Sequence, residues 1–306
     1  MKLSELALLG GYEFCGPDNE IKTIRYSHCA ERNDIAIIKT EKEIFNTKAV
    51  CVLTKPMLLH TDKSMLFSCD PVEIAAVKIS KILNKEKLFE IEQNVYDKQV
   101  GDFYVGKGVE IDVSASIAPN VYIGNYVKIG AGSVIEPNVC IGSYTVIGKN
   151  VHIGMGSSIG ARSFYHYYDE GLQEFPGAGD AIISDNVSIG SNTIIQRGTF
   201  SDTYIGTGCK IGNLIDIGHD VCIGSNCKIV SQSGIASQVT IDDFVQIYGQ
   251  SGIANNVKIG DHVTVMAKSV VTKDIRSGQC VSGMYARNHF SELKRQAKLN
   301  KLLEEK

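Results

Sequence analysis

An aliphatic residue recurs at every sixth position through most of the last two thirds of the chain. The series runs from Ile111 to Ile159, continues in phase from Ile183 to Ile195, and resumes after a four-residue slip from Ile205 to Val271. Glycine usually follows, and the fifth position of each hexad is nearly always small or β-branched, which suits short extended segments. Such a hexapeptide repeat predicts a parallel β-helix, in which three hexads, about 18 residues, complete one triangular coil.

The segments on either side of the repeat lack this period. Short apolar runs at 35–38 and 49–53 predict buried strands, and the apolar spacing from Pro71 to Leu83 predicts a helix. The apolar positions of the tail predict a second, only moderately amphipathic helix. We therefore predict a mainly β fold with a small α/β domain at 1–100, a β-helix at 101–285 and a C-terminal helix at 286–306.

Composition excludes several classes of protein. The 306 residues carry a formal net charge of −3, which gives no reason to expect a nucleic-acid partner. No apolar stretch approaches the roughly 20 residues of a membrane span, and the first residues lack a signal-peptide core, so we expect a cytoplasmic protein. The nine cysteines form no C-x-x-C pair, and Cys209 and Cys227 occupy the fifth hexad position, so we predict buried thiols and no metal site.

One histidine has a position that suggests chemistry. His219 follows the inward-facing Ile217 by two residues and is therefore expected to project outward near a corner. The repeat places Ser237 and Asn255 at the same corner in the next two coils, and Arg197 one coil below. An imidazole takes up a proton from an amine or hydroxyl near neutral pH, and a main-chain N–H one coil higher, about 4.8 Å away, suits an oxyanion.

The longest interruption of the repeat, at about 161–181, begins with a run of aromatic residues and histidine from Phe164 to Tyr168. A purely solvated loop rarely carries so many rings. Two interpretations stay open: the rings pack on the prism or on a neighbouring subunit, or they contact a ligand.

The repeat around His219 resembles a known family. The stretch Asn213–Gly224 resembles the core N-L-x-Q-I-A-H-N-V-x-I-G of the UDP-3-O-acylglucosamine N-acyltransferases of lipid A synthesis. The family's paired G-Q-x-G-I-A segments are similar to Ser231–Ala236 and Gly249–Ala254, and its R-G-x-x-x-D-T element to Arg197–Thr203. The resemblance covers nearly the whole chain, including the order of the domains.

The resemblance implies a homotrimer of left-handed β-helices, an N-terminal nucleotide-binding domain, and active sites in clefts between subunits. It implies that His219 is the general base and that the Ser237 N–H is the oxyanion donor. Either Asp216 or Asp220 would orient the imidazole, and small residues would leave a groove for the pantetheine arm. The predicted acceptor-binding residues are Asn213, Asp216, Asp220, Arg197, Phe164, Tyr165, Tyr168, Asn255 and Asn256, and the predicted donor-binding residues are Gln232, Gly234, Gln250 and Gly252.

Two differences from the family bear on the acceptor. Asn256 stands where the family has a second histidine, and Ile37–Glu43 lacks the N-P-x-Y element of its uridine site. These differences favour another nucleotide-linked amino sugar, for example a dTDP-linked one with a short acyl-CoA donor. We therefore predict an N-acyltransferase of lipid A or surface-polysaccharide synthesis that uses acyl-CoA or acyl carrier protein as co-substrate and binds no cofactor.

Four other functions bear comparison with this sequence. The chain resembles O-acyltransferases that act on a sugar hydroxyl, but those generally lack the N-terminal domain. It is also compatible with the lipid A enzyme itself, using 3-hydroxyacyl carrier protein. A γ-type carbonic anhydrase needs an H-x4-H pair, which His152, His219 and His262 do not provide. A structural or ice-binding prism needs Thr-x-Thr ladders, which the repeat lacks.

Overall fold

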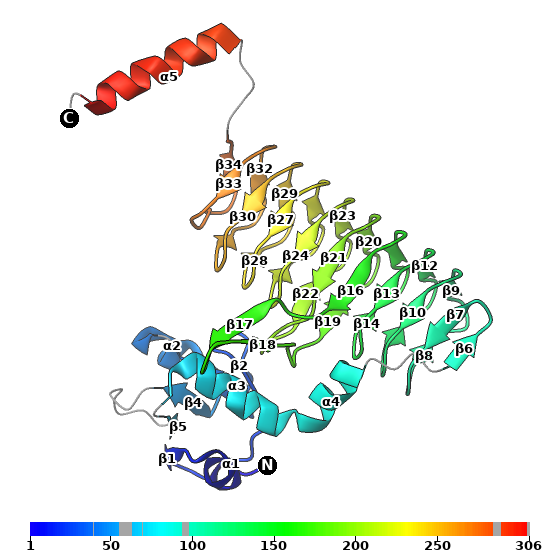
Figure 1. Ribbon diagram of the computed structural model, residues 1–306, viewed down its shortest axis with the longest axis vertical. Helices are drawn as coiled ribbons and strands as arrows, with labels where there is room; N and C mark the ends of the chain where they lie inside the picture. The colour runs from blue at the N-terminus through cyan, green and yellow to red at the C-terminus, as the bar shows by residue number, and fades with distance from the viewer. Residues whose placement is uncertain (39, 55–62, 69, 94–97, 284–288, 305–306) are drawn as a thin grey trace.

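The computed structural model describes all residues except 39, 55–62, 69, 94–97, 284–288 and 305–306. A small α/β region, a long prism of short stacked strands and a C-terminal helix follow one another along the chain (Figure 1). This order confirms the predicted mainly β architecture. Within the part of the chain that the structure describes, no helix is long and apolar enough to cross a membrane.

The N-terminal region is built on one five-stranded sheet. Its elements are α1 (Leu3–Gly10), β1 (Glu13–Cys15), β2 (Thr23–Tyr26), β3 (Asp34–Ile37), α2 (Glu41–Asn46), β4 (Cys51–Thr54), β5 (Ser64–Phe67), α3 (Val72–Leu83) and α4 (Lys85–Gln93). The strand order is β1-β5-β4-β3-β2, and only the edge strand β1 is antiparallel. Helices α1 and α3 pack on one face and Ile44 of α2 on the other. The predicted helix and strands are confirmed.

The prism has three flat sheets, which we call sheets I, II and III. Sheet I contains β6 (Lys98–Val100), β7 (Phe103–Val105), β10 (Tyr122–Ile123), β13 (Cys140–Ile141), β16 (Ser158–Ala161), β21 (Ile194–Gln196), β24 (Asp216–Ile217), β27 (Gly234–Ile235), β30 (Gly252–Ile253) and β33 (Val270–Val271). Sheet II contains β8 (Glu110–Ile111), β11 (Lys128–Ile129), β14 (Val146–Ile147), β19 (Ala181–Ile183), β22 (Thr203–Ile205), β25 (Cys222–Ile223), β28 (Thr240–Ile241) and β31 (Lys258–Ile259). Sheet III contains β9 (Ser116–Ile117), β12 (Val134–Ile135), β15 (His152–Ile153), β20 (Ser188–Ile189), β23 (Lys210–Ile211), β26 (Lys228–Ile229), β29 (Gln246–Ile247), β32 (Thr264–Val265) and β34 (Cys280–Val281).

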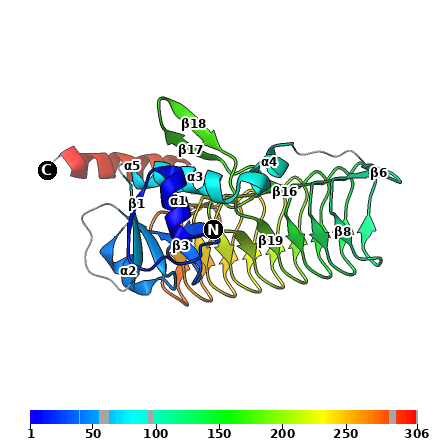
Figure 2. The same cartoon turned by 90° about the horizontal axis from the view of Figure 1, so that it is seen from below.

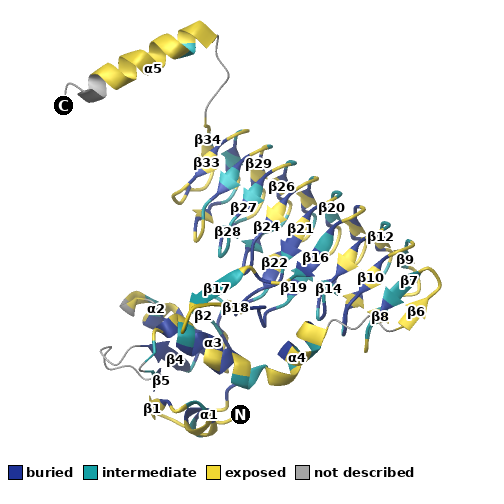
Figure 3. Cartoon of the chain, viewed as in Figure 1, coloured by how far each residue is buried: buried dark blue, intermediate teal, exposed yellow. Residues whose placement is uncertain are grey.

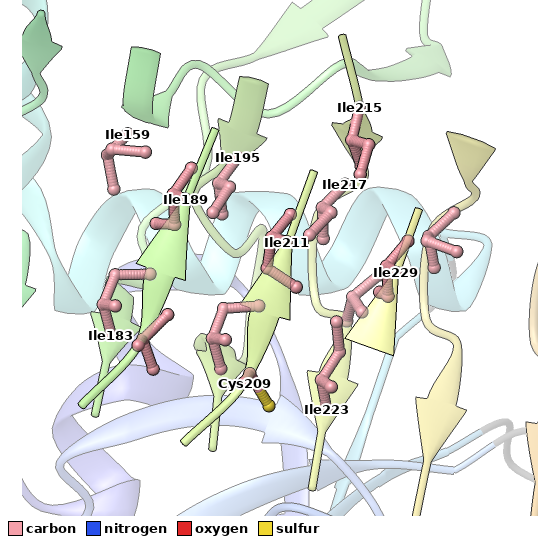
Figure 4. Close-up of a cluster of buried hydrophobic side chains, with 14 of the residues drawn as sticks. Ile159, Ile183, Ile189, Ile195, Cys209, Ile211, Ile215, Ile217, Ile223 and Ile229 are labelled. Carbon is pink, nitrogen blue, oxygen red and sulfur yellow. The ribbon is translucent and has the colours of Figure 1, made fainter. Parts of the chain in front are cut away.

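The six-residue period sets the register of the coils. Each inward aliphatic residue pairs in parallel with the next one three hexads on, as in Ile123↔Ile141 and Ile129↔Ile147. Figure 4 shows inward side chains of the middle coils, such as Ile195 and Ile217, packing coil upon coil, with Cys209 among them. Cys209 and Cys227 are both fully buried there, as predicted for small apolar side chains. The prism is therefore held by one continuous aliphatic core.

Three departures from the period shape the prism. After Ile159 the chain leaves the stack as an antiparallel hairpin of β17 (Tyr165–Tyr168) and β18 (Leu172–Phe175), where we had predicted a loop. The chain returns at β19, where Ile183 pairs with Ile147 as the repeat requires. The four extra residues of the sequence, which we call the slip, then lie between β21 and β22. The last coil is shorter than the others, because Val265 pairs with Val281.

The N-terminal region packs against the middle of the prism. Figure 2 shows the hairpin standing out beside α3, with the N-terminal sheet nearby. One apolar cluster joins side chains of the N-terminal region to Phe175 of the hairpin and Phe200 of the slip. Helix α5 (His289–Glu304) instead extends away beyond β34, and Figure 3 shows its surface almost wholly exposed.

Candidate active site

Four residues stack at the corner where sheet I passes into sheet II. We call Arg197, His219, Ser237 and Asn255 the His219 column. The inward residues two positions earlier pair as Ile195↔Ile217, Ile217↔Ile235 and Ile235↔Ile253, which confirms the predicted register. A Cβ added to Gly218 would lie 2.9 Å from the main-chain nitrogen of Ser237, so this nitrogen lies directly over the residue that precedes His219.

The carboxylate of Asp220 orients the imidazole of His219. Its Oδ2 lies 2.7 Å from Nδ1 of His219, and since a carboxylate only accepts, Nδ1 carries the proton and Nε2 the free lone pair. Its Oδ1 accepts the main-chain N–H groups of Thr199, Phe200 and Ser201 at 3.1, 3.2 and 2.8 Å. Both oxygens of Asp220 are therefore engaged inside the protein, which differs from the predicted contact with a substrate.

The side chain of His219 lies outside the aliphatic core but is covered. It projects outward near a corner, as predicted, but its exposed fraction is only 5%. The ring of Tyr165 in β17 meets it edge-on, with centroids 5.8 Å apart and planes at 81°. Burial raises the pKa of Tyr165 to about 12, so its hydroxyl is protonated at neutral pH. Through Tyr165 the hairpin thus forms a wall over one side of the base.

The main-chain N–H of Ser237 has no hydrogen-bond acceptor among the described residues. Lower at the same corner, the N–H of Lys107 donates to Oδ1 of Asn125 at 2.8 Å, and that of Asn125 to Oγ of Ser143 at 3.0 Å. Asn255 stands one coil above Ser237 but accepts no such bond. The N–H groups of His219 and Asn255 likewise have no acceptor among the described residues, and that of Ser237 is the uncapped donor that lies one coil above the imidazole.

The carboxyl end of β2 approaches this column. Tyr26, the last residue of β2, accepts a hydrogen bond from Nε2 of Gln238 at 3.0 Å. Its main-chain N–H donates to Oγ of Ser201 at 3.3 Å, and its ring meets that of Phe200 edge-on. Neither Tyr26 nor Gln238 was among the predicted site residues, because nothing local in the sequence links positions so far apart.

Arg197 serves the structure, which corrects its predicted role in substrate binding. The residue is 1% exposed, and its guanidinium donates to the carbonyl of Gly179 at 2.9 and 2.8 Å and to that of Ser143 at 3.2 Å. Asp180 lies 3.4 Å away. Burial lowers the pKa of Arg197 to about 10. The guanidinium ties the base of the hairpin to the coil below and offers no surface to a substrate.

The other predicted acceptor residues are spread more widely. Phe164 and Tyr168 point outward from the hairpin, with exposed fractions of 76% and 77%. Asp216 accepts a long hydrogen bond from Gln196 and so does not orient the imidazole. Asn213 lies at the opposite corner of sheet I, where its Oδ1 caps the N–H of Ser191. Asn256 follows Asn255, the top residue of the column, and its N–H donates to the carbonyl of Ser237.

A shallow, mostly apolar groove of about 420 Å³ crosses the outer face of sheet I between these two corners. Gly234 and Gly252 line it, and a Cβ at either would meet no atom within 4 Å, so packing requires neither glycine. Gln232 and Gln250, two residues before these glycines, form a hydrogen-bonded pair of 2.7 Å and do not line the groove. Among the described residues, no three His, Cys, Asp or Glu side chains converge as metal ligands.

Similar proteins carry the same repeat. Residues 104–137 match the family model described as bacterial transferase hexapeptide (six repeats). Among solved structures, a UDP-N-acetylglucosamine acyltransferase of Francisella novicida is 29% identical with a TM-score of 0.56, over 64% of this chain and 72% of that one. The UDP-N-acetylglucosamine O-acyltransferase (LpxA) of Moraxella catarrhalis is 27% identical (TM-score 0.55; 64% and 77% of the two chains). LpxA of Acinetobacter baumannii is 26% identical (TM-score 0.56; 64% and 76%).

Proposed function

We propose that this chain, a hexapeptide-repeat transferase homologous to acyltransferases, moves an acyl group from a thioester to the amine of a nucleotide-linked amino sugar. The observation that carries the proposal is the pairing of two groups in one column. An imidazole with a fixed tautomer lies below an uncapped main-chain N–H, under an aromatic wall. A base and an oxyanion donor in this relation are what acyl transfer requires.

In the proposed reaction, the sugar amine attacks the thioester carbonyl while Nε2 of His219 takes its proton. Asp220 stabilises the imidazolium that forms, since its carboxylate already binds Nδ1. The oxyanion of the tetrahedral intermediate binds the N–H of Ser237. As the intermediate collapses, the carbon–sulfur bond breaks and the leaving thiolate takes the proton from the imidazolium. An amide and a free thiol result, and the base returns to its neutral form.

The two substrates would approach from different sides. The groove on sheet I suits the donor, because its two unneeded glycines leave room for an extended pantetheine arm of coenzyme A or acyl carrier protein. The nucleotide suits the carboxyl edge of β2 to β5, where parallel sheets commonly bind ligands and where Tyr26 reaches the column. The protein would act in the cytoplasm as a homotrimer, with the exposed rings of the hairpin near a neighbouring copy.

A panel of substrates tests this function. Full-length protein is incubated with nucleotide amino sugars that carry a free amine, or with the matching N-acetylated sugars, and with acetyl-CoA, longer acyl-CoA or acyl carrier protein thioesters. We expect thiol release only with a free amine, and a product that resists hydroxylamine, because hydroxylamine cleaves esters and spares amides. No thiol release from any pair would contradict acyl transfer.

O-acyl transfer is the second candidate function, favoured by the likeness to an O-acyltransferase at 27% identity. The same base would then take the proton of a sugar hydroxyl. Thiol release with the N-acetylated sugars and a hydroxylamine-labile product would support this candidate over the first.

A further inference from the structure

Hydrogen bonds close a ring around the proposed active site. Asp220 joins the imidazole of His219 through Oδ2 (2.7 Å) and the main-chain N–H of Ser201 through Oδ1 (2.8 Å). The Oγ of Ser201 accepts the main-chain N–H of Tyr26 (3.3 Å), and the hydroxyl of Tyr26 accepts Nε2 of Gln238 (3.0 Å). The main-chain N–H of Gln238 then donates to the carbonyl of His219 (3.0 Å).

This ring links three parts of the chain that lie far apart in sequence. Its members come from the end of β2, from the four-residue slip before β22, and from two successive coils of the His219 column. Tyr26 is 6% exposed, so its hydroxyl is bound in a dry setting where a hydrogen bond is worth more than at the surface. Burial raises the pKa of Tyr26, so this hydroxyl stays neutral.

Gln238 follows Ser237 directly and has a left-handed backbone, with φ of 61°, as Asp220 and Asn256 have at the same position of the coils below and above. Its side chain is the one that reaches Tyr26. A residue other than glycine needs surrounding contacts to stay in that conformation. The bonds that Gln238 makes to His219 and Tyr26 fix the peptide unit after Ser237, whose carbonyl also accepts the N–H of Asn256. This unit adjoins the one that carries the N–H of Ser237, so it limits the rotation of Ser237 and, through it, the direction of that N–H.

We infer that Tyr26 and Gln238 are positioning residues. Through their hydrogen bond, the N-terminal region holds the oxyanion-binding N–H of Ser237 and the imidazole of His219 in their relative positions. This inference rests on the proposed function. Neither side chain needs to touch the reacting atoms. The loss of either should therefore lower the rate of the chemical step and leave substrate affinity almost unchanged.

The test compares Tyr26→Phe, Gln238→Ala and the double variant with wild type in the full-length protein. Tyr26→Phe keeps the buried ring and removes only the hydroxyl. We expect each single variant to lower kcat about five- to tenfold, the range of one hydrogen bond, with KM for the acceptor within about twofold. The double variant should be no slower than the slower single variant, because both remove one interaction. Tyr204→Phe is the matched control, since that hydroxyl binds Ser184 on sheet II, away from the column.

A second measurement is independent of activity. Hydrogen–deuterium exchange of the peptide that contains Gln238 should be faster in Tyr26→Phe than in wild type and in Tyr204→Phe, because the bond from Gln238 to His219 loosens. Equal exchange, or an unchanged kcat in both single variants, would overturn the inference. A loss of melting temperature with full activity per folded molecule would also overturn it. If no substrate is turned over by wild type, the proposed function fails and the exchange result alone decides the inference.

Discussion

Asp220 binds Nδ1 of His219 with one carboxylate oxygen and gathers three consecutive main-chain N–H groups with the other. The same carboxylate therefore orients the proposed base and holds the inserted segment Thr199–Ser201 beside it. Asp220→Asn replaces one acceptor oxygen by a donor group and removes the charge. We expect kcat to fall by about 10²-fold or more and stability to fall by about 1.5–3 kcal/mol, the loss of hydrogen bonds to a charged acceptor.

Steady-state kinetics and thermal unfolding of the purified variant measure both effects. Asp185→Asn is the control for the loss of a capping carboxylate, because Oδ1 of Asp185 accepts the main-chain N–H of Lys149 at 2.7 Å, away from the His219 column. Equal activity of the two variants would contradict the role given to Asp220.

The proposed base itself is tested by two replacements of His219. His219→Asn keeps a donor for the Asp220 carboxylate and removes the basic nitrogen Nε2, whereas His219→Ala removes both the donor and the base. We expect kcat to fall by about 10²- to 10⁴-fold in both, with a melting temperature closer to wild type in the Asn variant. His262→Ala, an exposed histidine stacked on Phe244, should keep full activity. Near-full activity of either His219 variant would refute the assignment.

The oxyanion donor is a main-chain group, so the two substitutions at Ser237 should differ sharply. Ser237→Ala keeps the N–H and should keep its activity. Ser237→Pro removes an N–H that no described group in the chain accepts, so kcat should fall by about 10²- to 10³-fold, the cost of one oxyanion donor. Thermal unfolding confirms that the proline variant is folded. Similar rates for both variants would place the donor elsewhere.

The six-residue period predicts the prism so well because the packing of the core requires that period. Each inward side chain must pack on the inward side chain of the coil below. The hairpin was missed because its strands run outside that core, and the short final coil because its spacing breaks the period. Ser237 and Asn255 were placed correctly above His219 by counting. The hydrogen-bonded ring through Tyr26 could not be predicted by counting hexads, because only tertiary packing brings together residues 212 positions apart. The finer resemblance to the UDP-3-O-acylglucosamine N-acyltransferases remains a prediction.

The glycines of the groove should respond differently from those of the corners. Gly234→Ala adds a methyl group in open space and should raise stability by up to about 0.5–1 kcal/mol, because glycine in a strand costs that much. Gly234→Val should leave the fold intact and raise KM for the thioester donor about tenfold, as methyl groups enter the groove. Gly142→Ala should unfold more easily, because its Cβ would collide with the carbonyl of Gly160. An unchanged KM for the thioester donor in Gly234→Val would show that the donor does not bind in this groove.

Arg197 should matter for stability and not for chemistry. Arg197→Met leaves the carbonyls of Gly179 and Ser143 without their donor in a buried setting, at a cost of about 3 kcal/mol or more. Activity per folded molecule and KM for the acceptor should stay within about threefold of wild type at low temperature. Denaturant unfolding and kinetics on the same sample separate the two. If Arg197→Met were as stable as wild type but had a raised KM for the acceptor, the result would show that Arg197 contacts the substrate.

The hairpin leaves the stack after β16 and rejoins it at Ala181, and the coils above and below keep their parallel pairing apart from one local register shift between Ile159 and Ala161. The wall over His219 is consequently an exchangeable part, since its length and composition can vary while the coils that carry the base and the donor N–H stay where they are. A change of sugar specificity in this scaffold thus needs no change in the machinery that transfers the acyl group.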